Sequence, residues 1–275
     1  MLQPQRKKNK RVWYTHRGTV IVFITLRILI VLTGVLSFLR SDYESVFIAV
    51  FTFFLLLLPS ILSQKLNITL PSALEIIILC FMFAANILGE INNFYVTVPH
   101  WDTILHTLNG FCFAAIGFAL VDMLNRHERV SLHLSPLFLS VVAFCFSMTI
   151  GVLWEFYEYT ADRILVLDMQ KDTVIHEFNT VALDDTQDNI AIQVRNIADV
   201  IIVHSDGSQE LLGLGGYLDI GLHDTMKDLL VNMIGAIVFS VIGYFYVKQQ
   251  GKGKLAPRFI PQVNPPKEVK SASCT

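Results

Sequence analysis

The chain has 275 residues, of which 53% are hydrophobic and 16% are charged, and its mean hydropathy is +0.53. Because an ordinary soluble domain carries about 25% charged residues, this composition excludes a typical soluble globular protein. The formal net charge is −2, and nothing in the composition predicts a nucleic-acid partner. The four cysteines include no C-x-x-C pair, so neither a disulfide framework nor a thiolate metal site is expected.

Six windows along the chain are long and apolar enough to cross a bilayer as helices. A hydrocarbon core of about 30 Å requires about 20 mostly apolar helical residues. Ser135 and Pro136 supply a cap and a first-turn proline for the fifth window, and Ser72 with Glu75 predicts a capping box that opens the third. The first window precedes no small-x-small cleavage site, so we expect it to remain in the mature protein. The predicted spans are 19–39, 45–62, 72–89, 103–123, 135–159 and 224–247.

Basic residues predict the orientation of these helices, because short cytoplasmic loops carry an excess of Lys and Arg. The two termini and the loops on their side hold 15 such residues, against 4 on the opposite side, so both termini are predicted to be cytoplasmic. Arg27, inside the first span, is expected to extend to the cytoplasmic surface. The predicted organisation is a basic flank at 1–18, transmembrane helices one to five at 19–159, an acidic extracytoplasmic loop at 160–222, the sixth helix at 223–247 and a disordered cytoplasmic tail at 248–275.

The loop at 160–222 is more than a linker. It holds eleven acidic residues against three basic ones, which gives it a net charge of −8. Ser205-Asp206-Gly207-Ser208 stands between two apolar runs and predicts a β-hairpin. We therefore expect an all-α membrane helix bundle with a small extracytoplasmic β-hairpin loop, and we expect this loop to cover the outer helix ends as a lid.

Polar residues gather at the outer ends of three predicted spans, and ionisable residues at such positions mark functional sites by default. Spacings of three and four residues put the members of each helix on one helical face, and Asn109 and Gly110 lie about one turn below the first pair. We predict that the set converges in one pocket open to the outside. It comprises Asp102 and His106, then Glu155 and Glu158, then Asp224, Asp228 and Asn232.

Electrostatics indicates what such a pocket requires. Two carboxylates about 6 Å apart at an effective dielectric constant of about 20 would repel by roughly 3 kcal/mol, so the acids are expected to share protons or bind a cation. Carboxylates with one imidazole and one amide favour a divalent Mg²⁺, Mn²⁺ or iron ion. The predicted metal ligands are Glu155, Glu158, Asp224 and Asp228, and the predicted catalytic groups are His106, Asp102 and Asn232.

Structural interpretations of the same residues stay open. Asp102 and Asp224 begin predicted helices, where Asp is a preferred N-cap. His106 and Asn232 would serve as interhelical hydrogen-bonding groups, a role worth about 1 kcal/mol. Glu158 would be solvated at the membrane interface. The shared depth of the set on three helices favours a functional site over these interpretations.

Three motifs form a series across about residues 85–245. They are Trp101-Asp102-x-x-x-His106-x-x-x-Gly110, Trp154-Glu155-x-x-Glu158, and Asp224-x-x-x-Asp228 followed by Gly235-Ala236. This series resembles the YjdF-type family of uncharacterised bacterial inner-membrane proteins. It is also similar to the broader VanZ-like pattern, whose last element Asp228, Asn232 and Gly235 match, although Glu158 stands where that pattern has Gln. The resemblance implies a bacterial inner-membrane protein of unassigned activity, with glycopeptide-resistance proteins as distant relatives.

Three functions are compatible with this pattern. The favoured hypothesis is a metal-dependent enzyme that acts on a lipid-linked or phosphate-bearing substrate at the outer membrane interface. The first alternative is an ion- or proton-coupled transporter, for which polar residues should also line the inner halves of the spans. The second alternative is a non-catalytic envelope or resistance factor whose loop binds a cell-envelope component. The lipid bilayer is the one partner that the sequence predicts directly, and no oligomeric state follows from it.

Overall fold

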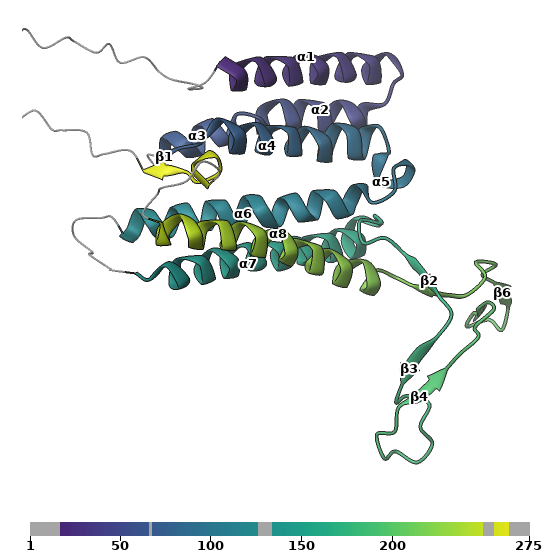
Figure 1. The fold of residues 1–275 in the computed structure, drawn as a ribbon. Coiled ribbons are helices and arrows are strands. Elements are labelled where there is room, and N and C mark those ends of the chain that lie inside the picture. Colours follow the sequence, from purple (N-terminus) through teal and green to yellow (C-terminus); the bar gives the residue numbers. More distant parts are fainter. Residues whose placement is uncertain (1–16, 66–67, 126–133, 250–255, 264–275) are drawn as a thin grey trace, which may run out of the picture. The chain divides into compact units, whose positions relative to one another are not determined.

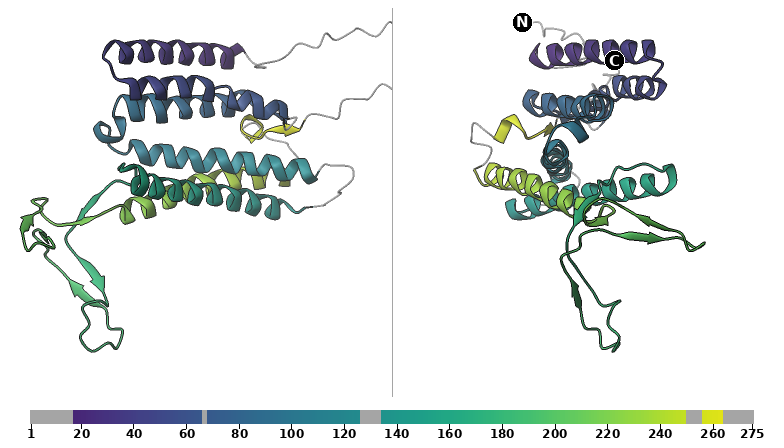
Figure 2. Two further views of the ribbon diagram at one scale, coloured as in Figure 1. Left: turned by 180° about the vertical axis from the view of Figure 1, so that it is seen from behind. Right: turned by 90° about the vertical axis from the view of Figure 1, so that its right-hand side faces the viewer.

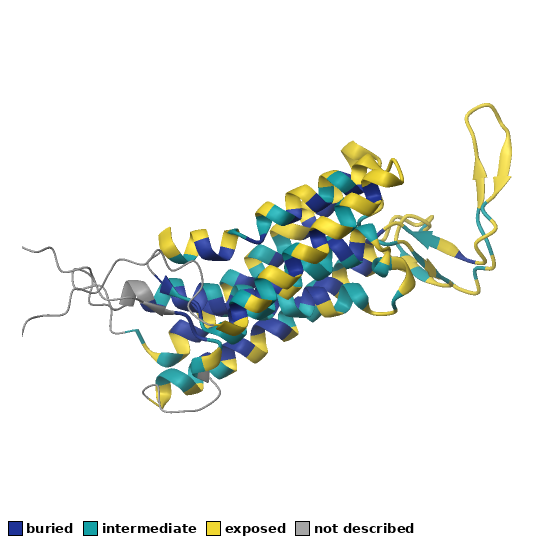
Figure 3. Cartoon of the chain, turned by 90° about the horizontal axis from the view of Figure 1, so that it is seen from above, coloured by how far each residue is buried: buried dark blue, intermediate teal, exposed yellow. Residues whose placement is uncertain are grey.

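The computed structural model describes residues 17–65, 68–125, 134–249 and 256–263. Within these ranges six helices are long and apolar enough to cross a membrane, as predicted (Figure 1). Large apolar side chains such as Ile21, Leu32 and Phe47 are more than half exposed on them, as expected of surfaces that face lipid. Figure 3 shows exposed residues along the helices. The spans are Arg17–Leu39, Tyr43–Lys65, Ser72–Ile91, Trp101–Asp122, Pro136–Leu165 and Leu222–Lys248.

The chain forms two compact units. The first contains residues 1–149 and 231–275, and the second contains residues 150–230. Helices α7 (Pro136–Leu165) and α8 (Leu222–Lys248) each run without a break from one unit into the other.

The second span is interrupted, and Arg27 of α1 (Arg17–Leu39) binds at the break. It consists of α2 (Tyr43–Leu55) and α3 (Leu58–Lys65), because the ring and missing N–H of Pro59 prevent a continuous helix. Nη2 of Arg27 donates to the carbonyl oxygen of Phe53 at 3.0 Å, and its guanidinium lies 3.7 Å from the centre of the Phe53 ring. Arg27 is therefore held inside the bundle rather than extended to the surface, because the broken helix offers it an acceptor.

The third span begins without the predicted capping box. Pro71 occupies the N-cap position of α4 (Ser72–Phe83) and no side chain caps this end, so Ser72 is one residue too far along the helix to act as the cap. Glu75 is buried instead of reaching back to a cap. After α4 the span continues as a π-helix, η1 (Ala84–Ile91), and the short α5 (Phe94–Thr97) follows.

Helix α6 (Trp101–Asn125) packs against the parts of α7 and α8 in the first unit. A β-carbon on Gly110 would overlap the carbonyl oxygen of Asn232, and one on Gly235 would overlap that of Thr107. The glycines thus allow the backbones of α6 and α8 to touch. The hydroxyl of Ser147 on α7 donates to the carbonyl oxygen of Gly110 at 2.7 Å, which joins α7 to the same point.

Part of the predicted tail is ordered, which differs from the expectation for residues 248–275. Strand β8 (Gln262–Val263) pairs antiparallel with β1 (Ile68–Thr69), and a 3-10 turn, η2 (Ala256–Arg258), precedes it. Ile260 is buried in the core formed by Leu74 and its neighbours. Burial of the apolar Phe259 and Ile260 favours packing of this segment against the core. The sequence did not predict this packing because the tail as a whole is polar.

The second unit contains the ends of α7 and α8 and three two-stranded ribbons (Figure 2). The predicted hairpin is present: Val203 pairs with Gln209, and Gly207 takes the positive φ of +86° that the turn requires. The residues of both of its strands are exposed, Ile202 by 39%. The ribbons pair β2 (Thr173–Ile175) with β7 (Tyr217–Asp219), β3 (Phe178–Thr180) with β4 (Ile192–Val194), and β5 (Ile201–Val203) with β6 (Gln209–Leu211).

Candidate functional site

The first pair of predicted site residues lies at the start of α6. This helix begins at Trp101, so Asp102 is inside its first turn and His106 follows one turn later on the same face. Nε2 of His106 lies 3.4 Å from Oδ1 of Asp102, and the imidazole is buried. The pair is in place to orient the imidazole, as predicted from the spacing.

Asn232 joins three helices in the first unit. Nδ2 of Asn109 on α6 donates to Oδ1 of Asn232 at 3.1 Å, and Nδ2 of Asn232 lies 3.7 Å from the sulfur of Met148 on α7. Asn232 is 1% exposed. These contacts agree with the structural interpretation of Asn232 as an interhelical hydrogen-bonding group.

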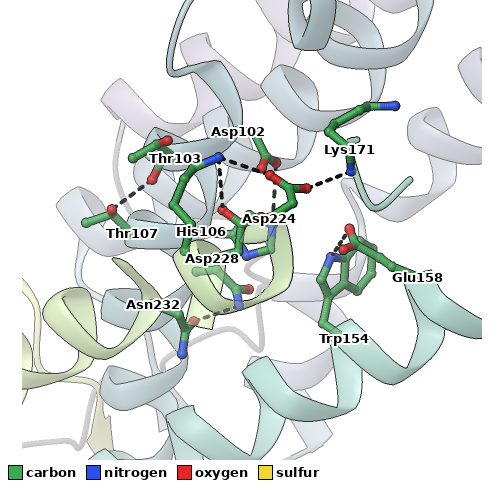
Figure 4. A network of polar contacts seen from close by, with 12 residues as sticks. Asp102, Thr103, His106, Thr107, Trp154, Glu158, Lys171, Asp224, Asp228 and Asn232 are labelled. Atoms are coloured by element: carbon green, nitrogen blue, oxygen red, sulfur yellow. Dashed lines mark hydrogen bonds and ion pairs between the residues drawn. The ribbon is translucent and has the colours of Figure 1, made fainter. Parts of the chain in front are cut away.

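The four predicted metal ligands all belong to the second unit, and all four are buried. The exposed fractions of Glu155, Glu158, Asp224 and Asp228 are 4%, 7%, 7% and 1%. The possibility that Glu158 is solvated was therefore wrong, because the indole of Trp154 donates to its Oε1 at 2.7 Å (Figure 4). The carboxylates of Glu155 and Glu158 approach within 4.8 Å of each other.

On α8 the acids are held by nearby donors. Asp224 lies inside the first turn and is not the N-cap, since Asp219 accepts a hydrogen bond from the backbone N–H of His223 at 2.8 Å. Oδ2 of Asp224 accepts from the backbone N–H of Lys171 at 2.8 Å (Figure 4). Nζ of Lys227 lies 3.0 Å from Asp224 and 3.8 Å from Asp228.

A short loop segment, Met169–Lys171, ties the end of α7 to the start of α8. Asp162 on α7 accepts the backbone N–H groups of Met169 and Gln170 at 2.6 and 2.9 Å. The side chain of Gln170 donates to the hydroxyl of Thr225 on α8 at 2.5 Å. This segment belongs to the predicted acidic loop and covers the beginning of α8.

The surroundings of this segment are strongly acidic. Burial raises the pKa of Asp172, and the carboxylates of Asp168 and Asp219 raise it further. Asp172 therefore lies within reach of the negative charges of other carboxylates.

Sequence reasoning missed three partners of the acids. Lys227 could have been found from its spacing of three residues from Asp224 on a predicted helix. Trp154 stands near a predicted span end, where an aromatic residue of the membrane interface is expected, and its bond to Glu158 follows from the i to i+4 spacing. The backbone of Lys171 carried no signal, because a loop N–H reaches Asp224 only through the tertiary fold.

Comparison with known proteins places this chain in a family. Residues 20–195 match the model of a family described as predicted membrane protein (DUF2238). The chain belongs to the DUF2238 family. The matched range of this DUF2238 protein includes the residues from Asp102 to Glu158 but ends before Asp224.

A bacterial relative adds little to what the family shows. An uncharacterised protein of Thermotoga maritima is 28% identical over 166 residues, which cover 60% of this chain and 77% of the relative. No solved structure matches the chain. The family description and the six apolar helices agree that the DUF2238 protein is a multi-pass membrane protein.

Proposed function

We propose that this DUF2238 protein is a metal-dependent enzyme that acts on a lipid-linked or phosphate-bearing substrate at the outer membrane interface. The observation that carries the proposal is the burial of four carboxylates in one compact unit, at the ends of two membrane-spanning helices. Buried acids are rare without a cation or shared protons, because removing their charges from water is costly. The proposed ligands are Glu155, Glu158, Asp224 and Asp228.

Charge balance favours a metal over protein cations alone. Two carboxylates within 4.8 Å of each other, as in Glu155 and Glu158, repel by roughly 3.5 kcal/mol at an effective dielectric constant of about 20. Lys227 lies beside Asp224 and Asp228 and neutralises one charge between them. A divalent cation with oxygen ligands would offset the remaining negative charge, and Mg²⁺, Mn²⁺ and iron accept such ligands.

These roles suit hydrolysis or transfer at phosphorus. Glu155, Glu158, Asp224 and Asp228 would hold the metal, which would supply a Lewis acid for the anionic oxygens of the substrate. His106, oriented by Asp102, would accept the proton of the attacking water or hydroxyl group. As the new phosphorus–oxygen bond forms, the bond from phosphorus to the lipid alcohol or to the terminal phosphate would break, and that group would leave. Asn232 would donate a hydrogen bond, and the surrounding bilayer would present the lipid part of the substrate.

Metal analysis of the purified protein tests the proposal most directly. We expect about one equivalent of Mn, Fe or Mg per chain after exposure to each ion and removal of excess, and loss of this metal in Glu155→Gln. Glu177→Gln is the matched control, because Glu177 is an exposed acid in the same unit. A wild-type protein that retains none of these ions under loading conditions would contradict the proposal.

A second assay tests the substrate class. Prenyl and diacylglycerol phosphates or diphosphates would be offered to the metal-loaded protein in nanodiscs, with products followed by mass spectrometry. We expect phosphate release or transfer in the wild type and its loss in His106→Gln. A metal-loaded protein that converts neither class would instead fit a non-catalytic envelope or resistance factor.

An ion- or proton-coupled transporter is the second candidate, and one observation favours it. Glu75 near the start of α4 and Asp122 near the end of α6 are both buried, so acids also stand at the span ends that the sequence predicts to be cytoplasmic. A transporter would move a divalent cation or protons across proteoliposomes. Flux that depends on Glu75 and Asp122, without any product from the lipid phosphates, would favour this function over the enzyme.

The location and wider relationships belong to the proposal as well. The excess of Lys and Arg on the side of the termini supports cytoplasmic termini. The motif resemblance to YjdF-type proteins supports the bacterial inner membrane. The VanZ-like resemblance rests on Asp228, Asn232 and Gly235, and the Gln that Glu158 replaces weakens it as a shared ligand set.

A further inference from the structure

A cavity of about 510 Å³ lies where the ordered part of the tail meets the beginning of α4. Its volume is in the range of pockets that bind small ligands. The cavity belongs entirely to the first unit and shares no residue with the buried carboxylates of the second. It is lined by Thr69, Leu70, Pro71, Ser72, Ala73 and Ile76 and, from the tail, by Pro257 and Arg258.

The residues that follow Arg258 in the chain anchor the tail segment to the first unit. Ile260 is 1% exposed, and the ring of Phe259 packs edge-on against Phe111 of α6 with 5.5 Å between ring centres. The backbone pairing of β8 with β1 follows immediately. These contacts hold the backbone at Arg258 beside the cavity, and its exposed side chain is part of the cavity lining.

The cavity is lined by one basic residue, Arg258, together with polar and apolar residues. No acidic residue is among the described residues that line it, and Glu75, in the same turn of α4, is buried outside the lining. Arg258 is joined in the sequence by Lys248, Lys252 and Lys254, which follow or end the last span. Leu70 and Ile76 provide apolar surface beside this charge.

We propose that this cavity binds the phosphodiester headgroup of an anionic phospholipid from the adjacent membrane leaflet. The cavity lies at the start of the span Ser72–Ile91, which places it at the level of the headgroups. Clusters of Lys and Arg next to the end of a membrane helix attract anionic lipids, and a planar guanidinium binds phosphate oxygens in pairs. The apolar wall would contact the first carbons of the acyl chains, which a soluble phosphate lacks.

Lipid titration of the full-length protein tests this site. The protein would be purified in a neutral detergent and titrated with phosphatidylglycerol or phosphatidylcholine, with thermal stability and lipid retention in native mass spectrometry as the readouts. We expect phosphatidylglycerol to bind more tightly than phosphatidylcholine, and Arg258→Gln to weaken its binding about fivefold, as expected for one basic group at a membrane surface. Lys65→Gln is the control, because Lys65 ends α3 as an exposed base that does not line the cavity.

Each other outcome overturns the lipid site. Equal binding of the two lipids, or equal weakening by Arg258→Gln and Lys65→Gln, would show that the cavity has no selective role. Glycerol 3-phosphate is added in a separate titration as the headgroup without acyl chains. If it stabilises the protein as well as phosphatidylglycerol does, and Arg258→Gln removes the effect, the site binds a soluble phosphate and the lipid proposal fails.

Discussion

The carbonyl oxygen of Asn232 occupies the position that a β-carbon on Gly110 would need. Helices α6 and α8 therefore touch through their backbones at this point. On the α6 side, His106 lies one turn before Gly110. The close approach thus fixes the part of α6 that carries the proposed catalytic histidine.

Gly110→Ala is expected to destabilise the bundle by about 1–3 kcal/mol, because the added methyl group would overlap backbone that has no room to shift. The measurement is the thermal midpoint of the detergent-solubilised protein. Gly18→Ala is the control, since nothing lies within 4 Å of a β-carbon at Gly18. A loss of stability in the control equal to that in Gly110→Ala would refute a specific effect of helix contact.

The hydrogen bond between Asn109 and Asn232 is expected to couple α6 to α8 by about 0.6 kcal/mol and at most about 1.7 kcal/mol, the range found for such bonds within membranes. The measurement is a double-mutant cycle of Asn109→Leu and Asn232→Leu, read as the free energy of unfolding in mixed micelles. Additive effects of the two substitutions would mean that the bond at 3.1 Å contributes nothing to stability.

Labelling of cysteines in intact cells tests the proposed orientation. In a variant without the native cysteines, Ser208→Cys in the hairpin turn is expected to react with an impermeant maleimide before lysis. Lys65→Cys, at the opposite end of the spans, should react only after lysis. The reverse pattern would place the acids on the cytoplasmic side and would move the proposed substrate with them.

The turn of the hairpin is expected to loosen in acid. Hydrogen bonds from the hydroxyl and the backbone N–H of Ser208, at 2.6 and 2.9 Å, lower the pKa of Asp206 from its ordinary value of 3.8. A carboxyl group with a lowered pKa in the folded state stabilises that state above pH 3.8, and this contribution is lost as the pH falls through the folded-state pKa.

Hydrogen exchange of the peptide that contains β5 and β6, corrected for intrinsic rates, measures this effect. We expect protection to fall below about pH 4 in the wild type. In Asp206→Asn the protection should be lower at neutral pH and should change little with acid, because the side chain no longer titrates. Parallel pH profiles in the two proteins would assign the acid sensitivity to other groups.

Local sequence determined the elements of this protein. A bilayer core admits only helices about 20 residues long with apolar surfaces, so runs such as 19–39 predict their own conformation without reference to any partner. The hairpin follows in the same way from Ser205-Asp206-Gly207-Ser208, because a turn depends on the conformations of adjacent residues. The pairing of Asp102 with His106 is equally local, since a spacing of four residues puts both side chains on one helical face.

Contacts between distant segments were decided by the tertiary structure alone. No local pattern shows that the backbone N–H of Lys171 reaches Asp224, that Asn109 bonds to Asn232, or that Ile260 is buried in the core. The break at Pro59 was not predicted either, and with it the acceptor that holds Arg27 was missed. Such contacts depend on which helix faces pack together, and in a lipid solvent that choice rests on small residues and single hydrogen bonds, whose partners lie far apart in the chain.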